Sequence, residues 1–207
     1  MTGVRILSAL RSPVAPRGGA LSRLEIHDLG APVLQAAIAA AGLAPDEVDE
    51  LVLGNALGAG GNPARLVALA AGLPERVAGL SIDRQCCGGL DALVLGAALI
   101  ASGQAEVVAA GGVESYSRRP LRSRTDPEGG APLPYDRPPF VPWSDLDPEM
   151  DAAADALARE QGISRDAQDR WACESHAKAR AADLSPEIVP LAGLGHDAFA
   201  RALTPRL

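Results

Sequence analysis

Short apolar runs alternate with stretches of helical periodicity along residues 1–117, and no other feature of the sequence restricts the fold as strongly. The apolar runs have the length of strands and cover residues 4–10, 50–57, 78–84 and 106–110. Apolar residues at helical spacing fill intervals between them, at 26–41, 63–71 and 88–101. Strands joined by helices run parallel, because each helix carries the chain back to the same edge of the sheet. We therefore expect an α/β fold in which helices cover both faces of a mostly parallel sheet.

The pattern changes after residue 117. Residues 118–148 are rich in proline and arginine and have no apolar periodicity, which is typical of a functional or disordered loop. Four further elements are expected after this segment: helices at 149–160 and 165–182, a short strand at 187–189 and a short helix at 196–203. We therefore predict two parts, an α/β domain over 1–117 and a loop domain over 118–207.

Composition and charge argue against several classes of partner. Aromatic residues make up only 3% of a chain that is 47% hydrophobic, so the core must be built from aliphatic side chains. A formal net charge of −7 disfavours nucleic acid as a partner, because binding to phosphates is driven by cationic side chains. No apolar stretch approaches the roughly 20 residues that cross a bilayer, so no membrane partner is expected.

The chain has three cysteines, and two of them are adjacent. This arrangement is typical neither of a disulfide framework nor of a zinc site, since zinc ligands come in cysteine and histidine pairs at short regular spacings. We therefore expect no metal. Thiols without a disulfide framework also indicate a reducing compartment, so we expect the protein in the cytoplasm.

The segment at 81–90 is the strongest candidate for chemistry. An expected strand leads directly into Cys86-Cys87-Gly88-Gly89, where a helix begins, so the chain must form a sharp strand-to-helix elbow. Such an elbow lies at the carboxyl edge of a parallel sheet, and the N-terminus of its helix stabilises an anion. We therefore expect a nucleophilic cysteine in the thiolate form. Position alone leaves open the alternative that Cys86 and Cys87 are small, inert core residues.

Gly88 and Gly89 follow the two cysteines. Because they have no side chains, a substrate carbonyl can approach the backbone N–H groups at the start of the helix, which would form part of an oxyanion hole. The expected site therefore combines a thiolate with backbone donors for the negative charge that develops on the carbonyl oxygen.

The segment from Asp83 to Leu90 resembles the nucleophile motif of the thiolase family, Asn-(Arg/Lys)-x-Cys-(Ala/Gly)-Ser-Gly-(Leu/Met). The resemblance places Cys86, and not Cys87, at the cysteine that becomes acylated. Three further segments resemble thiolase motifs in the same order and spacing: Gly54-Asn55 with 61–65, 110–117, and 162–169 with Ser175-His176. Because four ordered motifs cover essentially the whole chain, it is identified as the N-terminal half of a thiolase with its loop domain.

The resemblance implies an acyltransferase that forms a cysteine acyl-enzyme from an acyl-CoA and completes a thiolysis or a Claisen condensation. Acyl-CoA or CoA is then the small-molecule partner, as a substrate, and no cofactor is implied. Met150 is implied to contact this substrate, because Glu149-Met150-Asp151 stands where many family members have a His-Met-Gly segment that helps to hold pantetheine.

Several residues depart from the family pattern. Gly88 stands in place of a serine, and Asp83 stands in place of an asparagine. Asp151 replaces a glycine and adds a negative charge near an anionic ligand. In the matching motifs, we expect Asn55 and Glu114 to position loops and hydrogen-bond networks near the site rather than to react.

Thiolases consist of two similar halves, and this chain resembles only the first. The second half supplies a Gly-His-Pro histidine, which activates the nucleophile, and a Cys-x-Gly cysteine; we expect none of His27, His176 and His196 to replace that histidine. The family's first half also takes its last strand from sequence after the loop domain, so we expect an incomplete sheet with an unpaired edge.

The implied macromolecular partner is a second copy in a homo-oligomer or a chain that carries a C-terminal thiolase half. Two alternatives to an active enzyme remain open. One is a non-catalytic half-thiolase that pairs with another subunit, or equally a fragment or a decayed copy. The other is a regulatory module that binds CoA.

Overall fold

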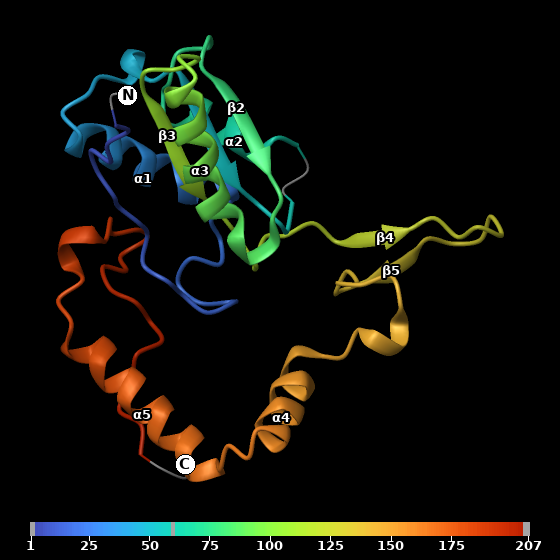
Figure 1. Cartoon of the computed structure of the whole chain (residues 1–207). Helices are drawn as coiled ribbons and strands as arrows, with labels where there is room; N and C mark the ends of the chain where they lie inside the picture. The colour runs from blue at the N-terminus through green and yellow to red at the C-terminus, as the bar shows by residue number, and fades with distance from the viewer. Residues whose placement is uncertain (1–2, 59–60, 205–207) are drawn as a thin grey trace. The chain divides into compact units, whose positions relative to one another are not determined.

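The computed structural model describes residues 3–58 and 61–204 and divides the chain into two compact units (Figure 1). The first unit contains Met1–Pro120 together with Leu184–Phe199. The second contains Leu121–Asp183 together with Ala200–Leu207. The first break therefore lies close to the expected boundary after residue 117, whereas the return of Leu184–Phe199 to the first unit has no counterpart in the expected division.

The first unit has the α/β fold expected from the sequence, and its elements follow one another in strand–helix alternation. Their order is α1 (Ile26–Ala40), β1 (Glu50–Gly54), α2 (Pro63–Ala70), β2 (Ala78–Ile82), α3 (Gly88–Ala101) and β3 (Val108–Gly112). Short 3-10 turns at Pro45–Glu47, Gln85–Cys87 and Ser185–Glu187 connect or follow these elements. The three expected helices and three of the expected strands are thus confirmed to within a few residues.

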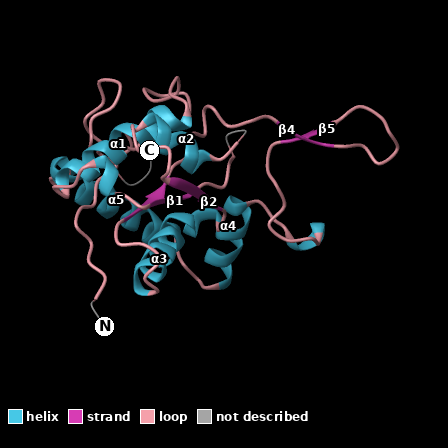
Figure 2. Cartoon of the chain, turned by 90° about the horizontal axis from the view of Figure 1, so that it is seen from above, coloured by secondary structure: helices cyan, strands magenta, loops and turns pink. Residues whose placement is uncertain are grey.

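The three strands form a parallel sheet in the order β2-β1-β3. At the carboxyl end of the sheet, Gly54 of β1 lies level with Ile82 of β2 and with Gly112 of β3. Helices α1 and α2 cover one face and α3 covers the other (Figure 2). Because the carboxyl ends of the strands are level, the loops that follow them meet at one edge of the sheet.

The core of the first unit is aliphatic, as the composition requires. It lies between the sheet and helices α1 and α2, and its buried side chains include Leu34, Ile38, Leu51, Val67 and Val77. Helix α3 contributes small residues to its contact with the sheet and keeps several large apolar side chains exposed. The two faces of the sheet are therefore covered unequally by the described residues.

The expected strand at 4–10 does not form. Its residues have no regular secondary structure, and the side chains of Ile6 and Leu7 are 78% and 58% exposed. A strand needs a hydrogen-bonding neighbour along its whole length, and here the chain makes only one parallel bridge, from Arg11 to Ile188. The expected strand at 187–189 is reduced to the same single bridge for the same reason.

The expected helix at 196–203 is wrong, because tertiary contacts use its polar groups. The N–H of Ala198 donates to the carbonyl of Val14 at 2.9 Å, in the first unit. The N–H of Arg201 donates to Nδ1 of His176 at 3.2 Å, in the second unit. These contacts to distant segments compete with a helix that is too short to be stable by itself.

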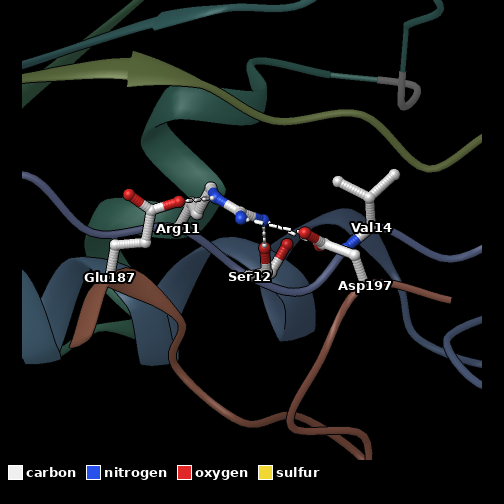
Figure 3. Close-up of polar contacts among 5 residues, drawn as sticks. All are labelled: Arg11, Ser12, Val14, Glu187 and Asp197. Carbon is white, nitrogen blue, oxygen red and sulfur yellow. Dashed lines mark hydrogen bonds and ion pairs between the residues drawn. The ribbon is translucent and has the colours of Figure 1, made fainter. Parts of the chain in front are cut away.

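Residues 184–199 are held to the first unit by the guanidinium of Arg11 (Figure 3). Arg11 Nε donates to Glu187 Oε1 at 2.8 Å, and its terminal nitrogens donate to the two carboxylate oxygens of Asp197 at 2.8 and 2.9 Å. The N–H of Val14 donates to Asp197 Oδ1 at 2.8 Å. Hydrogen bonds from Arg11 hold the pKa of Asp197 below its usual range. These charge-assisted bonds join segments at opposite ends of the sequence.

The second unit contains a two-stranded antiparallel hairpin and two helices. The hairpin pairs β4 (Arg122–Arg124) with β5 (Leu133–Tyr135), and the helices are α4 (Met150–Glu160) and α5 (Arg165–Ala181). A 3-10 turn at Ser144–Leu146 lies in the chain between β5 and α4. Ser164 caps α5 by accepting a hydrogen bond from the N–H of Ala167. Among the helices described in both units, none combines the length and apolar character that crossing a bilayer requires.

Candidate active site

The candidate site lies in the first unit, at the carboxyl edge of the parallel sheet. The loops after β1, β2 and β3 meet there because the three strands end level with one another. The loop after β2 contains Cys86, in the turn Gln85–Cys87 that leads directly into α3. The strand-to-helix elbow expected from the sequence is therefore present.

Cys86 and Cys87 are both exposed and both free. Neither side chain is therefore buried in the core of the first unit. No hydrogen bond in the described part of the chain joins Cys86 to a histidine: His27 lies on α1, His176 lies on α5, and His196 lies in the returning segment.

The backbone of the elbow is strained immediately before the candidate nucleophile. Gln85 has φ of 47°, a left-handed conformation that costs a residue other than glycine about 1–3 kcal/mol. The N–H of Gln85 donates to Asp83 Oδ1 at 2.8 Å, and Arg84 Nε forms an ion pair with Asp91 Oδ2 at 2.9 Å. Nothing in the residue type of Gln85 signals this conformation, and the sequence alone does not reveal that Asp83 helps to hold the turn.

The two glycines of the elbow have different surroundings. Gly88 is buried, and a Cβ on it would lie 3.1 Å from the Cα of Gly54 on β1. Its N–H already donates to the carbonyl of Gln85. A Cβ on Gly89 would lie 3.8 Å from the backbone of Gly111 and of Gly112, which is ordinary contact. Close packing of α3 on the sheet therefore explains why residue 88 is a glycine. The same packing would leave room for a side chain at residue 89.

Asn55 and Glu114 form a hydrogen-bond network across the same edge of the sheet. Asn55 Nδ2 donates to the carbonyl of Val113 at 2.9 Å and to Glu114 Oε2 at 3.0 Å. The N–H of Ala56 also donates to the Glu114 carboxylate, and the N–H of Gly58 donates to Asn55 Oδ1 at 2.9 Å. These bonds tie the loop after β1 to the loop after β3, as expected for residues that position loops near the site.

Met150 is the first residue of α4 and belongs to the second unit, whereas the cysteine elbow belongs to the first. Its side chain is 68% exposed, as a residue that contacts a ligand can be. Glu149, which precedes it, forms an ion pair with Arg137 at 3.3 Å. No group of three or more histidine, cysteine, aspartate or glutamate residues placed to hold a metal ion occurs among the described residues.

The fold and the site together define an α/β protein that presents an exposed cysteine on a strand-to-helix elbow. The chain belongs to the thiolase family, since the model of that family described as "Thiolase, N-terminal domain" matches residues 4–201. It is the N-terminal half of a thiolase, as its motifs indicate.

Curated relatives extend well beyond this chain. Over 202 residues the chain is 40% identical to an acetyl-CoA acetyltransferase of Cupriavidus necator, covering 92% of this chain and 51% of the relative. It is 36% identical over 202 residues to a probable acetyl-CoA acyltransferase of Staphylococcus aureus, with the same two coverages. The chain therefore spans about half the length of the curated relatives it matches.

Solved structures of thiolases have the same fold. An acetyl-CoA acetyltransferase of Bacillus anthracis matches with a TM-score of 0.78 and 35% identity, over 89% of this chain and 49% of that one. The Acat5 thiolase of Ascaris suum, solved in complex with coenzyme A, matches with a TM-score of 0.83 and 29% identity, over 97% and 55%. The thiolase-like fold expected from the motifs is thus confirmed.

Proposed function

We propose that this chain supplies the nucleophile half of a thiolase-type acyltransferase, and that Cys86 forms the acyl-enzyme with an acyl-CoA. The observation that carries the proposal is the exposure of Cys86 on the elbow directly before α3. The curated relatives named above are acetyl-CoA acetyltransferases or acyltransferases, which supports an acyl-CoA as the substrate class. The CoA thioester is a substrate here, and the reaction needs no further cofactor.

In the proposed condensation, Sγ of Cys86 attacks the thioester carbonyl of an acyl-CoA, a new C–S bond forms, and the CoA thiolate leaves; the acyl group then passes to the carbanion of acetyl-CoA. In the reverse direction, thiolysis, Sγ attacks the 3-keto carbonyl of a 3-ketoacyl-CoA, the C–C bond breaks, the acetyl-CoA carbanion leaves and takes up a proton, and the acyl group passes to the thiol of CoA. The N-terminal end of α3 faces the negative charge that develops on the carbonyl oxygen. Because the N–H of Gly88 is already used by Gln85, Gly89 is the better placed of the two expected backbone donors. We also propose Met150 as a contact of the CoA substrate.

A cavity in the first unit supports a requirement for a second thiolase half. It has a volume of about 580 Å³ and lies between residues 4–12, helices α1 and α3, and the outer edge of β3. Its walls are mostly aliphatic, and the segment at 4–10 that borders it is not in a sheet. A further strand, supplied by the C-terminal half or its equivalent, would pair with β3 and fill this space.

The exposed face of α3 supports the same requirement. Leu90 and Val94 are 64% and 60% exposed, and Leu93 is exposed beside them. Contiguous apolar side chains on a surface mark an interface with another protein segment. We therefore include a chain with a C-terminal thiolase half, or a second copy in a homo-oligomer, as the partner. Acyl-CoA metabolism in the cytoplasm is the proposed setting, which agrees with the three free cysteines.

Acylation of Cys86 is the direct test. The chain is mixed with a polypeptide that carries a C-terminal thiolase half, incubated with radiolabelled acetyl-CoA, and digested for peptide mapping. Label is expected on the peptide that contains Cys86, and Cys86→Ala is expected to lower acyl transfer about 10⁴-fold or more, as loss of a nucleophile does elsewhere. Cys173→Ala, which removes a free thiol of α5, is the matched control and is expected to retain the label. Absence of label on Cys86 in the complete mixture would contradict the proposal.

The same variant separates the enzyme from a non-catalytic partner subunit. The lack of a histidine hydrogen-bonded to Cys86 within the described residues favours this second candidate. A subunit that only assembles with an active partner would leave the complex fully active after Cys86→Ala. Full activity of that complex would therefore identify a scaffold, and loss of activity would identify a nucleophile.

Occupation of the cavity is tested by hydrogen exchange. When the C-terminal half binds, the backbone amides of Val108–Gly112 are expected to exchange more slowly. The reason is that a new strand would form hydrogen bonds with the backbone groups on the outer edge of β3. The amides of the central strand, Glu50–Gly54, already lie between two neighbours and are expected to change less. Equal slowing in both strands would indicate general stabilisation instead of pairing at this edge.

A further inference from the structure

The adjacent thiols of Cys86 and Cys87 form a cluster that the proposed function uses only in part. Both are exposed and free, and both belong to the turn Gln85–Cys87. The thiolase motif quoted above has alanine or glycine where Cys87 stands. A second thiol beside the nucleophile is therefore a property of this chain that the acyl-transfer reaction does not account for.

A direct disulfide between these residues is disfavoured by the local backbone. The Cα atoms of neighbouring residues are about 3.8 Å apart, whereas those of most disulfides are about 4.4–6.8 Å apart. The turn is also fixed by hydrogen bonds from the N–H of Cys87 to the carbonyl of Arg84, at 3.0 Å, and from the N–H of Gly88 to the carbonyl of Gln85. Drawing the two sulfurs into bonding distance would distort this turn.

A single atom that bonds to both sulfurs relieves this constraint. With bonds of about 2.3 Å to each sulfur, as zinc has to thiolates, the two sulfurs can remain between about 3 and 4 Å apart. Both side chains are exposed on one short turn, so rotation about χ1 and χ2 is available to turn the two sulfurs toward one shared atom. The pair is thus better suited to chelation than to oxidation.

The number of suitable side chains at the turn indicates which kind of atom the two thiols can bind. Zinc sites in proteins are usually completed by four ligands, and no group of three or more suitable side chains occurs at this turn or elsewhere among the described residues. Trivalent arsenic is thiophilic and needs only two sulfurs when it already carries an organic group. We infer that Cys86 and Cys87 together form a bidentate binding site for trivalent organoarsenicals.

The reaction is a condensation without change of oxidation state. Each thiol loses its proton, two As–S bonds form, and the oxygen of an arylarsenoxide, R–As=O, leaves as one molecule of water. The product is a ring that contains the arsenic atom, both sulfurs and the backbone between the two Cα atoms. Because Cys86 is the proposed nucleophile, the inference that the adduct blocks acyl transfer rests on the proposed function, whereas binding itself does not.

Titration with phenylarsine oxide in the absence of CoA tests the site. Intact-mass analysis is expected to find one arsenical per chain with loss of one water, and a thiol reagent is expected to find two fewer reactive thiols. Removal is expected to require a dithiol, because a monothiol competes poorly with two linked sulfurs. Cys86→Ala and Cys87→Ala are each expected to weaken binding by about 10²-fold or more, as loss of the second attachment point does.

Cys173→Ala is the control and is expected to bind phenylarsine oxide as the wild type does, since Cys173 lies on α5 of the second unit. Unchanged affinity in Cys87→Ala, or loss of affinity in Cys173→Ala, would overturn the inference. Acylation of Cys86 without a stable arsenical adduct would reject this site and leave the proposed function standing. An adduct in a chain that is never acylated would reject the proposed function instead.

Discussion

Replacement of Gly54 by alanine is expected to lower the free energy of unfolding by about 3 kcal/mol, at the upper end of the cost of overpacking a core. A Cβ on Gly54 would lie 2.4 Å from the carbonyl carbon of Gly88 and 2.7 Å from the nitrogen of Gly89. Both are backbone atoms of the elbow, so they cannot rotate away as a side chain would. Helix α3 would have to move off the sheet, and the turn that holds Cys86 would move with it.

Gly111→Ala is the matched control for this prediction. Gly111 lies on β3 beside Leu53 of β1, and a Cβ on it would meet only Leu53 Cδ2, at 3.9 Å. The free energy of unfolding of the Gly111→Ala variant is expected to stay within about 1 kcal/mol of that of the wild type. Urea denaturation followed by circular dichroism measures both variants. Similar midpoints for Gly54→Ala and Gly111→Ala would contradict the backbone contact described here.

Replacement of Arg11 by methionine is expected to lower the free energy of unfolding by about 2 kcal/mol. Arg11 donates to Glu187 and to both carboxylate oxygens of Asp197, and its removal leaves two carboxylates without this shared cation. Hydrogen bonds to charged groups contribute about 1.5–3 kcal/mol each when shielded, but these side chains are partly exposed, so solvent screening reduces the total. Arg5→Met, an exposed change on the same segment, is expected to cost less than about 0.5 kcal/mol.

The cost of Arg11→Met should also depend on pH. Arg11 lowers the pKa of Asp197 in the folded protein. The stabilisation of the fold by this ion pair is therefore complete above the ordinary aspartate pKa of about 3.9, and it is lost as the pH falls through the lower pKa that Asp197 has in the folded protein. The guanidinium remains charged throughout, because its two carboxylate partners raise its pKa. Urea denaturation at several pH values is expected to find the wild type and the variant converging below about pH 4. A difference that stays constant down to pH 3 would mean that the ion pair does not hold residues 184–199.

Much of the fold was accessible from local patterns. The apolar spacing within 88–101 matches α3 residue for residue, and Asn62 followed by Pro63 marks the start of α2. The elbow at Cys86 was accessible for the same reason, because a strand, two glycines and a helix in direct succession leave the chain no other path. The order of four motifs is likewise enough to identify the family from the sequence.

The errors have one physical cause. A strand depends on a partner that is distant in sequence, so an apolar run such as 4–10 predicts the capacity to pair and not the pairing itself. A short helix such as the one expected at 196–203 is marginal, and Asp197 is instead held by Arg11. The strain at Gln85 was equally hidden, since it arises from how the strand end and the helix start are joined.

Neighbouring residues in this chain were enough to determine its helices, its central strands, the cysteine elbow and its membership of the thiolase family, because periodicity, caps and turn glycines act over a few positions. Contacts between distant segments were decided only when the chain folded. The approach of Gly54 to Gly88, the closure of Arg11 on Asp197, and the cavity beside β3 each depend on the packing of several elements at once. Sequence patterns record which surfaces can pack, whereas the folded chain determines which of them meet.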